Sequence, residues 1–115
     1  MLADLSHHNI YFYNQPTDMR KGFNGLAGLV NKLEGANLTS GDIFVFVNKS
    51  KDKIKLLQWE KNGFAIYYKQ LEKGTFEWPT EEPQSVTIDY QKLYLMFEGI
   101  AFESVVRRPR YGLKI

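Results

Sequence analysis

The stretch QPTDMRKGFNGLAGL, residues 15–29, predicts a helix that begins directly after a helix-start signal. Its proline ends the preceding element, and Thr17 or Asp18 can accept hydrogen bonds from the free amides of the first helical turn. We therefore expect a helix over residues 19–33 that Gly35 closes. Its apolar side chains recur at spacings of three and four: Met19, Phe23, Leu26, Val30 and Leu33.

Three glycines spaced three residues apart interrupt this predicted helix: Gly22, Gly25 and Gly28. Each weakens a helix by about 1 kcal/mol relative to alanine, so the sequence predicts that something approaches the helix closely. One interpretation is tight packing of the helix on a sheet. The other is a glycine-lined surface that binds a partner, where Arg20 and Lys21 meet an anion.

Strands are predicted on both sides of this helix. Residues 9–13 are rich in isoleucine, tyrosine and phenylalanine and indicate a first strand. Residues 43–47 are almost wholly apolar, which is typical of a strand that is buried on both faces.

The dipeptide Asn62-Gly63 predicts a two-residue turn, because both of its positions tolerate positive backbone angles. With these two residues as the loop, Trp59 pairs with Ile66 on an apolar face that should cover the helix or the core. The other pairs expected on that face are Lys61 with Phe64 and Leu57 with Tyr68.

The last third of the chain predicts a short strand over residues 75–78, an acidic loop to Gln84, and a final helix that Asp89 caps. That helix should end near Gly99 and present Leu93, Met96, Phe97 and Ile100. The order of elements favours a single compact α+β domain over residues 1–104, with a mainly antiparallel sheet and two helices packed on it. Residues 105–115 form a basic C-terminal tail.

The composition is that of one folded domain, with 115 residues, 43% hydrophobic and 15% aromatic side chains. The chain has no cysteine, so disulfides and thiolate metal sites are excluded. No apolar stretch reaches the 18 or more residues of a membrane span, and no secretory signal is present, so we expect a cytoplasmic protein and no membrane partner.

The net charge is only +2, but the charges are unevenly distributed. Residues 49–73 carry seven lysines against three acids, residues 74–104 carry six acids against one lysine, and the tail is basic. These blocks predict one basic and one acidic surface, which would steer a polyanion or join copies of the protein into a homo-oligomer.

A DNA-binding interpretation depends on alternating lysines at positions 49, 51, 53 and 55. Lys53 and Lys55 share a face if both lie within one strand, and they can then follow a phosphate backbone. The cations expected to bind nucleic acid are Arg20, Lys21, Lys49, Lys51, Lys53, Lys55, Arg107, Arg108 and Arg110. The competing interpretation treats these as ordinary solvated side chains.

The inventory of catalytic groups is thin. The adjacent histidines at positions 7 and 8 point to opposite faces of an extended chain, which disfavours a shared metal. Asp18, Asp42 and Asp52 are the carboxylates that a two-metal site would need, and each has a simpler explanation as a cap or turn residue. With no P-loop, no nucleophile elbow and no metal-ligand spacing, we predict no catalytic residue, no metal and no cofactor.

Segments spread over most of the chain resemble, in order, the motifs of the TnpB-type accessory proteins of the insertion sequence 66 family of bacterial transposable elements. This family is distinct from the RNA-guided nucleases that share the name. The segments that carry the resemblance are residues 16–27, 42–46, 53–59, 63–79 and 95–100. Relatives tend to have arginine where residues 48–51 stand here, which weakens an expectation of base-specific contacts.

The resemblance implies a non-catalytic accessory protein that acts beside a separately encoded transposase. Two mechanisms remain open. In the first, the basic surface binds the DNA of the element. In the second, the protein is an adaptor that binds the transposase or itself through the glycine-bearing helix and the acidic segment, without touching DNA.

Overall fold

The computed structural model describes residues 8–79 and 85–99. These residues form one sheet with the strand order β4-β3-β2-β1-β5. The elements are β1 (Ile10–Phe12), α1 (Phe23–Val30), β2 (Ile43–Val47), β3 (Lys53–Glu60), β4 (Gly63–Gln70), β5 (Val86–Ile88) and α2 (Tyr90–Glu98).

Neighbouring strands are antiparallel except for β1 and β2, which are parallel. The exception follows from the connection, because α1 carries the chain back across the sheet between these two strands. The predicted α+β class with a mainly antiparallel sheet is confirmed.

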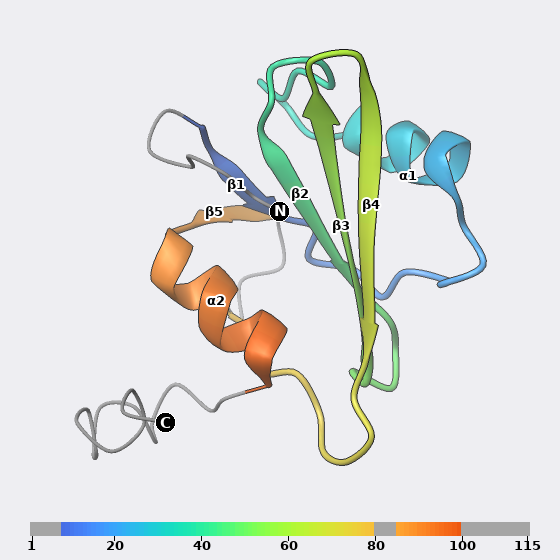
Figure 1. Ribbon diagram of the computed structural model, residues 1–115, viewed down its shortest axis with the longest axis vertical. Helices are drawn as coiled ribbons and strands as arrows, with labels where there is room; N and C mark the ends of the chain where they lie inside the picture. Colours follow the sequence, from blue (N-terminus) through green and yellow to red (C-terminus); the bar gives the residue numbers. More distant parts are fainter. Residues whose placement is uncertain (1–7, 80–84, 100–115) are drawn as a thin grey trace.

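The two helices lie on opposite faces of the sheet (Figure 1). On one face, Leu93 and Met96 of α2 pack on Phe12, Val45 and Leu56. On the other face, Leu26 and Val30 of α1 pack on the remaining alternate residues of the central strands: Phe44, Phe46 and Leu57. Every residue of β2 is buried, as its apolar sequence predicts for a strand covered on both sides.

Helix α1 is shorter than predicted, and neither Thr17 nor Asp18 caps it. The N-cap residue is Gly22, which has no side chain that could accept a capping hydrogen bond. Thr17 is instead buried with its amide bonded to the carbonyl of Val47 over 2.9 Å, so residues 17–21 form a loop fastened to the sheet. The helix ends at Val30, and isolated turns continue the chain to Gly35, which has a φ of +79°.

The glycines of α1 are not sites of tight packing against the sheet. No described atom comes within 4 Å of the place where a Cβ would stand on Gly22 or Gly28. At Gly25 the nearest neighbours are the side-chain carbons of Lys21, at 3.0 Å. Packing on the sheet comes from Leu26, Ala27 and Val30, so this interpretation of the glycines was wrong.

The hairpin forms, but its register differs by two residues from the prediction. Glu60 pairs with Gly63, so Lys61 and Asn62 form the loop and Lys61 takes the positive φ, +52°. Trp59 then pairs with Phe64, and their rings meet edge to face with centroids 4.8 Å apart. Aromatic cross-strand packing has therefore overridden the turn preference of the dipeptide. Because the shift is even, every side chain that remains within the two strands keeps its predicted face.

Residues 75–78 do not form the predicted strand. Phe76 is buried as part of an irregular segment, and its amide donates to the carbonyl of Lys51 over 2.6 Å. The Trp78 indole donates to the side-chain oxygen of Asn14 and packs edge-on against Phe12. The segment is thus held by its aromatic side chains and by one backbone hydrogen bond that belongs to no strand ladder.

The last helix agrees with its prediction. The Asp89 carboxylate accepts the Lys92 amide at 2.8 Å, and Gly99 ends the helix with a φ of +73°. Strand β5, which pairs with β1 immediately before this helix, was not predicted. Ile100, the boundary at residue 104 and the basic tail lie outside the described residues.

Candidate partner-binding surfaces

Lys55 is a structural residue of the fold. Its side chain is buried on the α1 face of β3, and Nζ donates to the carbonyls of Met19 and Lys21, each over 2.8 Å. The same ammonium group lies 4.8 Å from the centre of the Tyr68 ring. The structure therefore removes Lys55 from the predicted lysine stripe, because its donors are already used inside the molecule.

The other lysines of the stripe surround the turn between β2 and β3. The side-chain NH2 group of Asn48 donates a hydrogen bond to the Asp52 carboxylate over 2.7 Å. The side-chain oxygen of Asn48 accepts hydrogen bonds from the backbone amides of Asp52 and Lys53. Hydrogen bonding from Asn48, and then the charge of Lys53, lower the pKa of Asp52. This network holds the turn that presents Lys49 and Lys51 to solvent.

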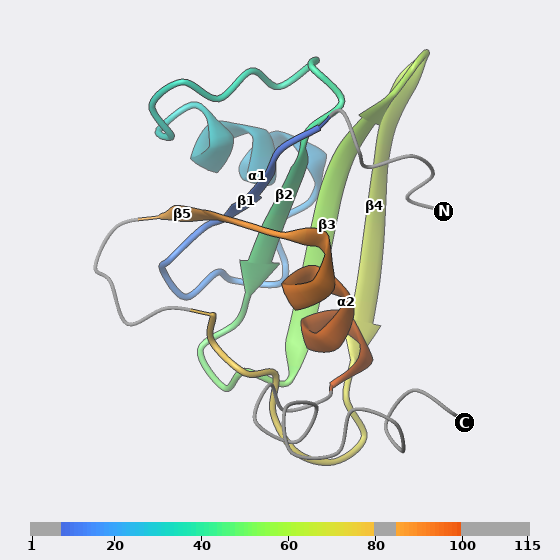
Figure 2. The same ribbon diagram turned by 90° about the vertical axis from the view of Figure 1, so that its left-hand side faces the viewer.

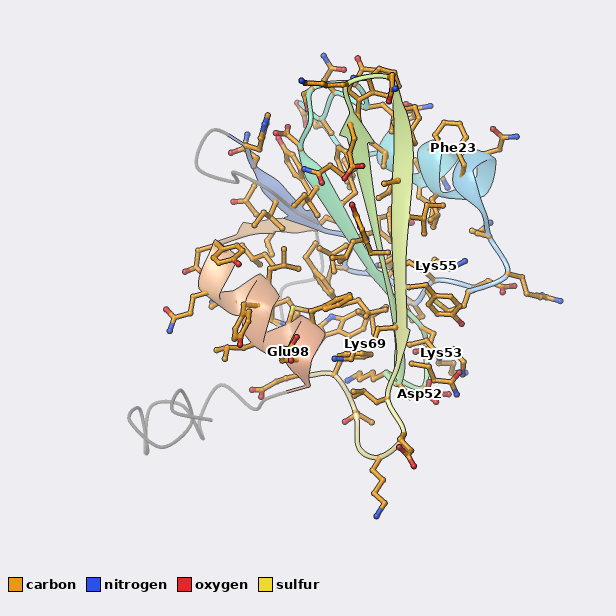
Figure 3. The ribbon with its side chains drawn as sticks, in the orientation of Figure 1. Phe23, Asp52, Lys53, Lys55, Lys69 and Glu98 are labelled. Atoms are coloured by element: carbon orange, nitrogen blue, oxygen red, sulfur yellow. The ribbon has the colours of Figure 1, made fainter. Side chains whose placement is uncertain are left out.

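Lys53 and Lys51 each have a partner within the molecule. The Lys53 ammonium lies 3.4 Å from the Asp52 carboxylate at the lower end of the sheet (Figure 3). Lys51 stands 5.2 Å from the centre of the Trp78 ring. Both are surface contacts of the kind that a phosphate can replace at little cost.

Arg20 and Lys21 lie in the loop before α1, where both are exposed. The Arg20 guanidinium donates through Nε and Nη2 to the Asp18 carboxylate. This pairing lowers the pKa of Asp18 from 3.8 to about 2. Arg107, Arg108 and Arg110 lie outside the described residues.

The lysine-rich and acid-rich blocks touch each other at two places. The segment that contains Phe76 and Trp78 belongs to the acidic block, yet it docks on Lys51 of the basic block. Lys69 of β4 lies 5.2 Å from the ring centre of Phe97, which precedes Glu98 on α2 (Figure 3). Neither contact involves an acidic side chain, so the expected separation into one basic and one acidic surface stays a prediction.

A continuous apolar surface extends from the first residue of α1 across β3 and β4. We call it the aromatic surface: Phe23, Trp59, Phe64, Ile66 and Tyr68. The Phe64 ring contacts two of the others, with its centroid 4.3 Å from that of Phe23 and 4.8 Å from that of Trp59. Phe23 is 37% exposed, Ile66 36% and Tyr68 52%.

Sequence reasoning expected these side chains to be covered by the helix. Helix α1 contacts β4 where Phe23 meets Phe64, whereas Ile66 and Tyr68 farther along β4 stay exposed, so this part of the face remains open. The alternation of apolar residues at positions 64, 66 and 68 indicates an apolar face on this strand. Because the helix was predicted to be longer, that face was expected to be covered. Figure 3 shows Phe23 and Lys55 on this side of the sheet.

An open groove of about 460 Å³ lies at the opposite edge of the sheet, between β1, β5 and the turns that follow α1. Tyr11 and Tyr13 line it together with Lys32, Glu34 and Thr87. The Tyr11 ring stacks on Phe44, so one wall belongs to the core.

The three carboxylates considered for metal binding are each engaged separately. Asp18 pairs with Arg20 and Asp52 with Asn48, as described above. The Asp42 carboxylate accepts a hydrogen bond from the backbone amide of Asn9 at 2.9 Å, and its Oδ1 lies 3.8 Å from Nδ1 of His8. Within residues 8–79 and 85–99, no three histidine, cysteine, aspartate or glutamate side chains gather into a group that could hold a metal ion.

Neither helix of the described chain is long and apolar enough to cross a membrane.

Comparison with known proteins places the chain in a family. No solved structure matches the chain significantly. Two proteins of Sinorhizobium fredii do match, both named as uncharacterized. Protein y4jC is 34% identical over 95 residues, which cover 83% of this chain and 81% of its own. Protein y4hO is 30% identical over 100 residues, which cover 87% of each chain.

The family model described as IS66 Orf2 like protein matches residues 8–107, and the chain therefore belongs to the IS66 Orf2-like family.

Proposed function

We propose that the protein is a non-catalytic accessory factor of transposition that binds the separately encoded transposase through the aromatic surface. Membership of the IS66 Orf2-like family supports the pathway. The single observation that carries the choice of partner is the cluster of Phe23, Phe64, Ile66 and Tyr68, which leaves large apolar side chains open to solvent.

Exposed aromatic clusters of this kind are typical of protein interfaces. Single exposed apolar residues are ordinary, whereas contiguous ones rimmed by polar groups mark binding sites. Aromatic side chains also contribute most of the binding free energy where they are desolvated at the centre of an interface. The predicted contribution of Gly22, Gly25 and Gly28 fits this proposal, because α1 borders the surface and the positions over Gly22 and Gly28 are open.

The test is binding of the purified protein to the transposase of its element after nuclease treatment. Phe23→Asp should weaken the complex by at least about tenfold, because it puts a charge into an apolar interface. The helix itself should tolerate the change, since an acidic side chain is favoured in the first turn. Tyr94→Asp is the matched control, because Tyr94 is 44% exposed on α2, across the sheet. Failure of the wild-type proteins to co-elute, or equal effects of the two variants, would contradict the proposal.

DNA binding is the second candidate, and one observation favours it. Because Lys55 holds the carbonyl of Lys21 at 2.8 Å, the Lys21 loop lies beside the strand that begins with Lys53. Lys21 and Lys53, which belong to two separate segments, thus both lie on the α1 side of the sheet. We include Lys49, Lys51, Lys53, Lys21 and Arg20 in this candidate interface and leave out Lys55.

Retention on element DNA as a function of salt distinguishes the two candidates. A DNA-binding protein loses affinity steeply as salt rises, with a slope set by the number of phosphates contacted. The combined variant K49Q/K51Q/K53Q should lower that slope, whereas K32Q/K92Q, on other parts of the surface, should leave it unchanged. Retention that is absent at low ionic strength would rule the second candidate out.

A further inference from the structure

Strand β4 forms one edge of the sheet over its full length (Figure 2). It pairs with β3 through all eight residues without a bulge, and its only charged side chain is Lys69. Edge strands usually carry a proline, a bulge or inward-pointing charges that prevent pairing with another chain. The opposite edge strand, β5, has only three residues, so β4 is the long unprotected edge among the described residues.

The backbone groups that face outward from β4 can be identified. The Leu71 amide donates to the carbonyl of Asp52 over 2.8 Å, which continues the ladder between the two strands. Odd-numbered residues of β4 therefore face β3, and even-numbered residues face away, because hydrogen-bonding direction alternates along an antiparallel strand. The N–H and C=O groups that point away from the sheet are those of Phe64, Ile66, Tyr68 and Gln70.

We infer that a second copy of this chain pairs with β4 along this edge, antiparallel and centred on Ile66, to join two sheets into one. Self-pairing in a two-fold arrangement requires outward-facing groups on both partners, so even-numbered residues must stand opposite even-numbered residues. Among the registers that satisfy this condition, the two that overlap the most residues of β4 are centred on Ile66 and on Tyr67.

Side-chain matching selects the first register. Centring on Ile66 places Ile66 opposite its symmetry mate and Phe64 opposite Tyr68, so the whole α1 face of the junction is apolar. Centring on Tyr67 places Phe64 opposite the amide of Gln70. Charge also permits the Ile66 register, because each Lys69 stands opposite Gly63 and about 20 Å along the strand from its symmetry mate.

The two-fold axis of such a junction runs perpendicular to the sheet, so both copies of α1 lie on the same side. The two aromatic surfaces then meet across the axis and form one larger surface between the helices. The inference stands independently of the proposed function, because the dimer can form whether or not the transposase binds there.

The first measurement is the mass of the purified wild-type protein by light scattering. We expect about 27 kDa, twice the 13.4 kDa of one chain. Ile66→Lys puts two like charges opposite each other at the axis and should raise the dimer dissociation constant at least about tenfold. Tyr94→Lys is the control on the far face and should remain dimeric. A monomeric wild type, or a variant Ile66→Lys that stays fully dimeric, overturns the inference.

A crosslinking pair tests the register directly, since the chain has no cysteine of its own. In the proposed register, Ile66→Cys brings two sulfur-bearing residues to a Cα separation of about 5.5 Å, which suits a disulfide. Tyr68→Cys leaves the corresponding pair about 15 Å apart. Mild oxidation should therefore link Ile66→Cys quantitatively and Tyr68→Cys poorly. Equal rates for the two variants would exclude the register centred on Ile66.

The two proposals fail in different ways. A dimer that crosslinks at position 66 but binds no transposase contradicts the proposed function and leaves the junction intact. A monomer that binds the transposase contradicts the dimer and supports the proposed function. Strand β4 is then free to pair with a strand of that partner.

Discussion

The ammonium group of Lys55 donates a hydrogen bond over 2.8 Å to the backbone carbonyl of Lys21, 34 residues earlier in the chain. A second hydrogen bond of equal length to the carbonyl of Met19 completes the connection. Together they hold the loop before α1 against the third strand. This relationship sets the start of the helix, and with it the place of Phe23 on the aromatic surface.

Replacing Lys55 should destabilise the fold more than replacing its neighbour in the stripe. Lys55→Met keeps most of the buried stem but removes both hydrogen bonds, so we expect the free energy of unfolding to fall by about 2 kcal/mol. Lys53→Met should change it by less than about 1 kcal/mol, because it removes only a surface ion pair. Urea denaturation of the two variants measures the difference, and equal effects would contradict the structural role of Lys55.

Gly28→Ala should stabilise the isolated protein. Gly28 lies inside α1, and no described atom comes within 4 Å of the point where the alanine Cβ would stand. Alanine should therefore add about 0.5–1 kcal/mol of helix stability without a clash. Thermal denaturation measures the gain. The same variant tests the predicted partner-binding role of the glycines, because weaker binding by a more stable protein would show that the partner approaches the helix there.

The pairing of Arg20 with Asp18 predicts a specific acid titration. The folded-state pKa of Asp18, about 2, lies below the ordinary 3.8, so the pair stabilises the protein above about pH 4 and the contribution is lost as the pH falls toward 2. Arg20→Ala should raise the pKa of Asp18 toward its ordinary value in an NMR titration. Lys21→Ala should have a much smaller effect, because its charge is the weakest of the influences on Asp18.

Asn48→Ala should loosen the turn between β2 and β3. The side chain of Asn48 makes three hydrogen bonds, to the Asp52 carboxylate and to the amides of Asp52 and Lys53. Their loss should reduce the free energy of unfolding by about 1–2 kcal/mol and raise the pKa of Asp52. Chemical denaturation and an NMR titration measure the two effects. Asn37→Ala, in an exposed turn with local contacts only, is the matched control.

Local features of the chain were predicted well where one residue type decides the backbone. The cap at Asp89, the end of the helix near Gly99 and the strand at residues 43–47 all follow from side-chain chemistry within a few residues. Predictions that required knowledge of distant neighbours were less successful. The hairpin register depended on the packing of Trp59 against Phe64, and the helix start depended on Lys55 and on the bond from Thr17 to Val47.

The candidate surfaces divide in the same way. Alternation along the sequence correctly put Lys53 and Lys55 on one face of a strand, but only the folded chain decides that Lys55 is buried under the loop of residues 19–21. The sequence by itself determined the fold class, the side on which the residues of β3 and β4 lie and the family to which the chain belongs. The tertiary structure decided which residues remain accessible, because the packing of α1 on the sheet sets what is covered, and that packing includes Phe64 of β4 but leaves Ile66 and Tyr68 exposed.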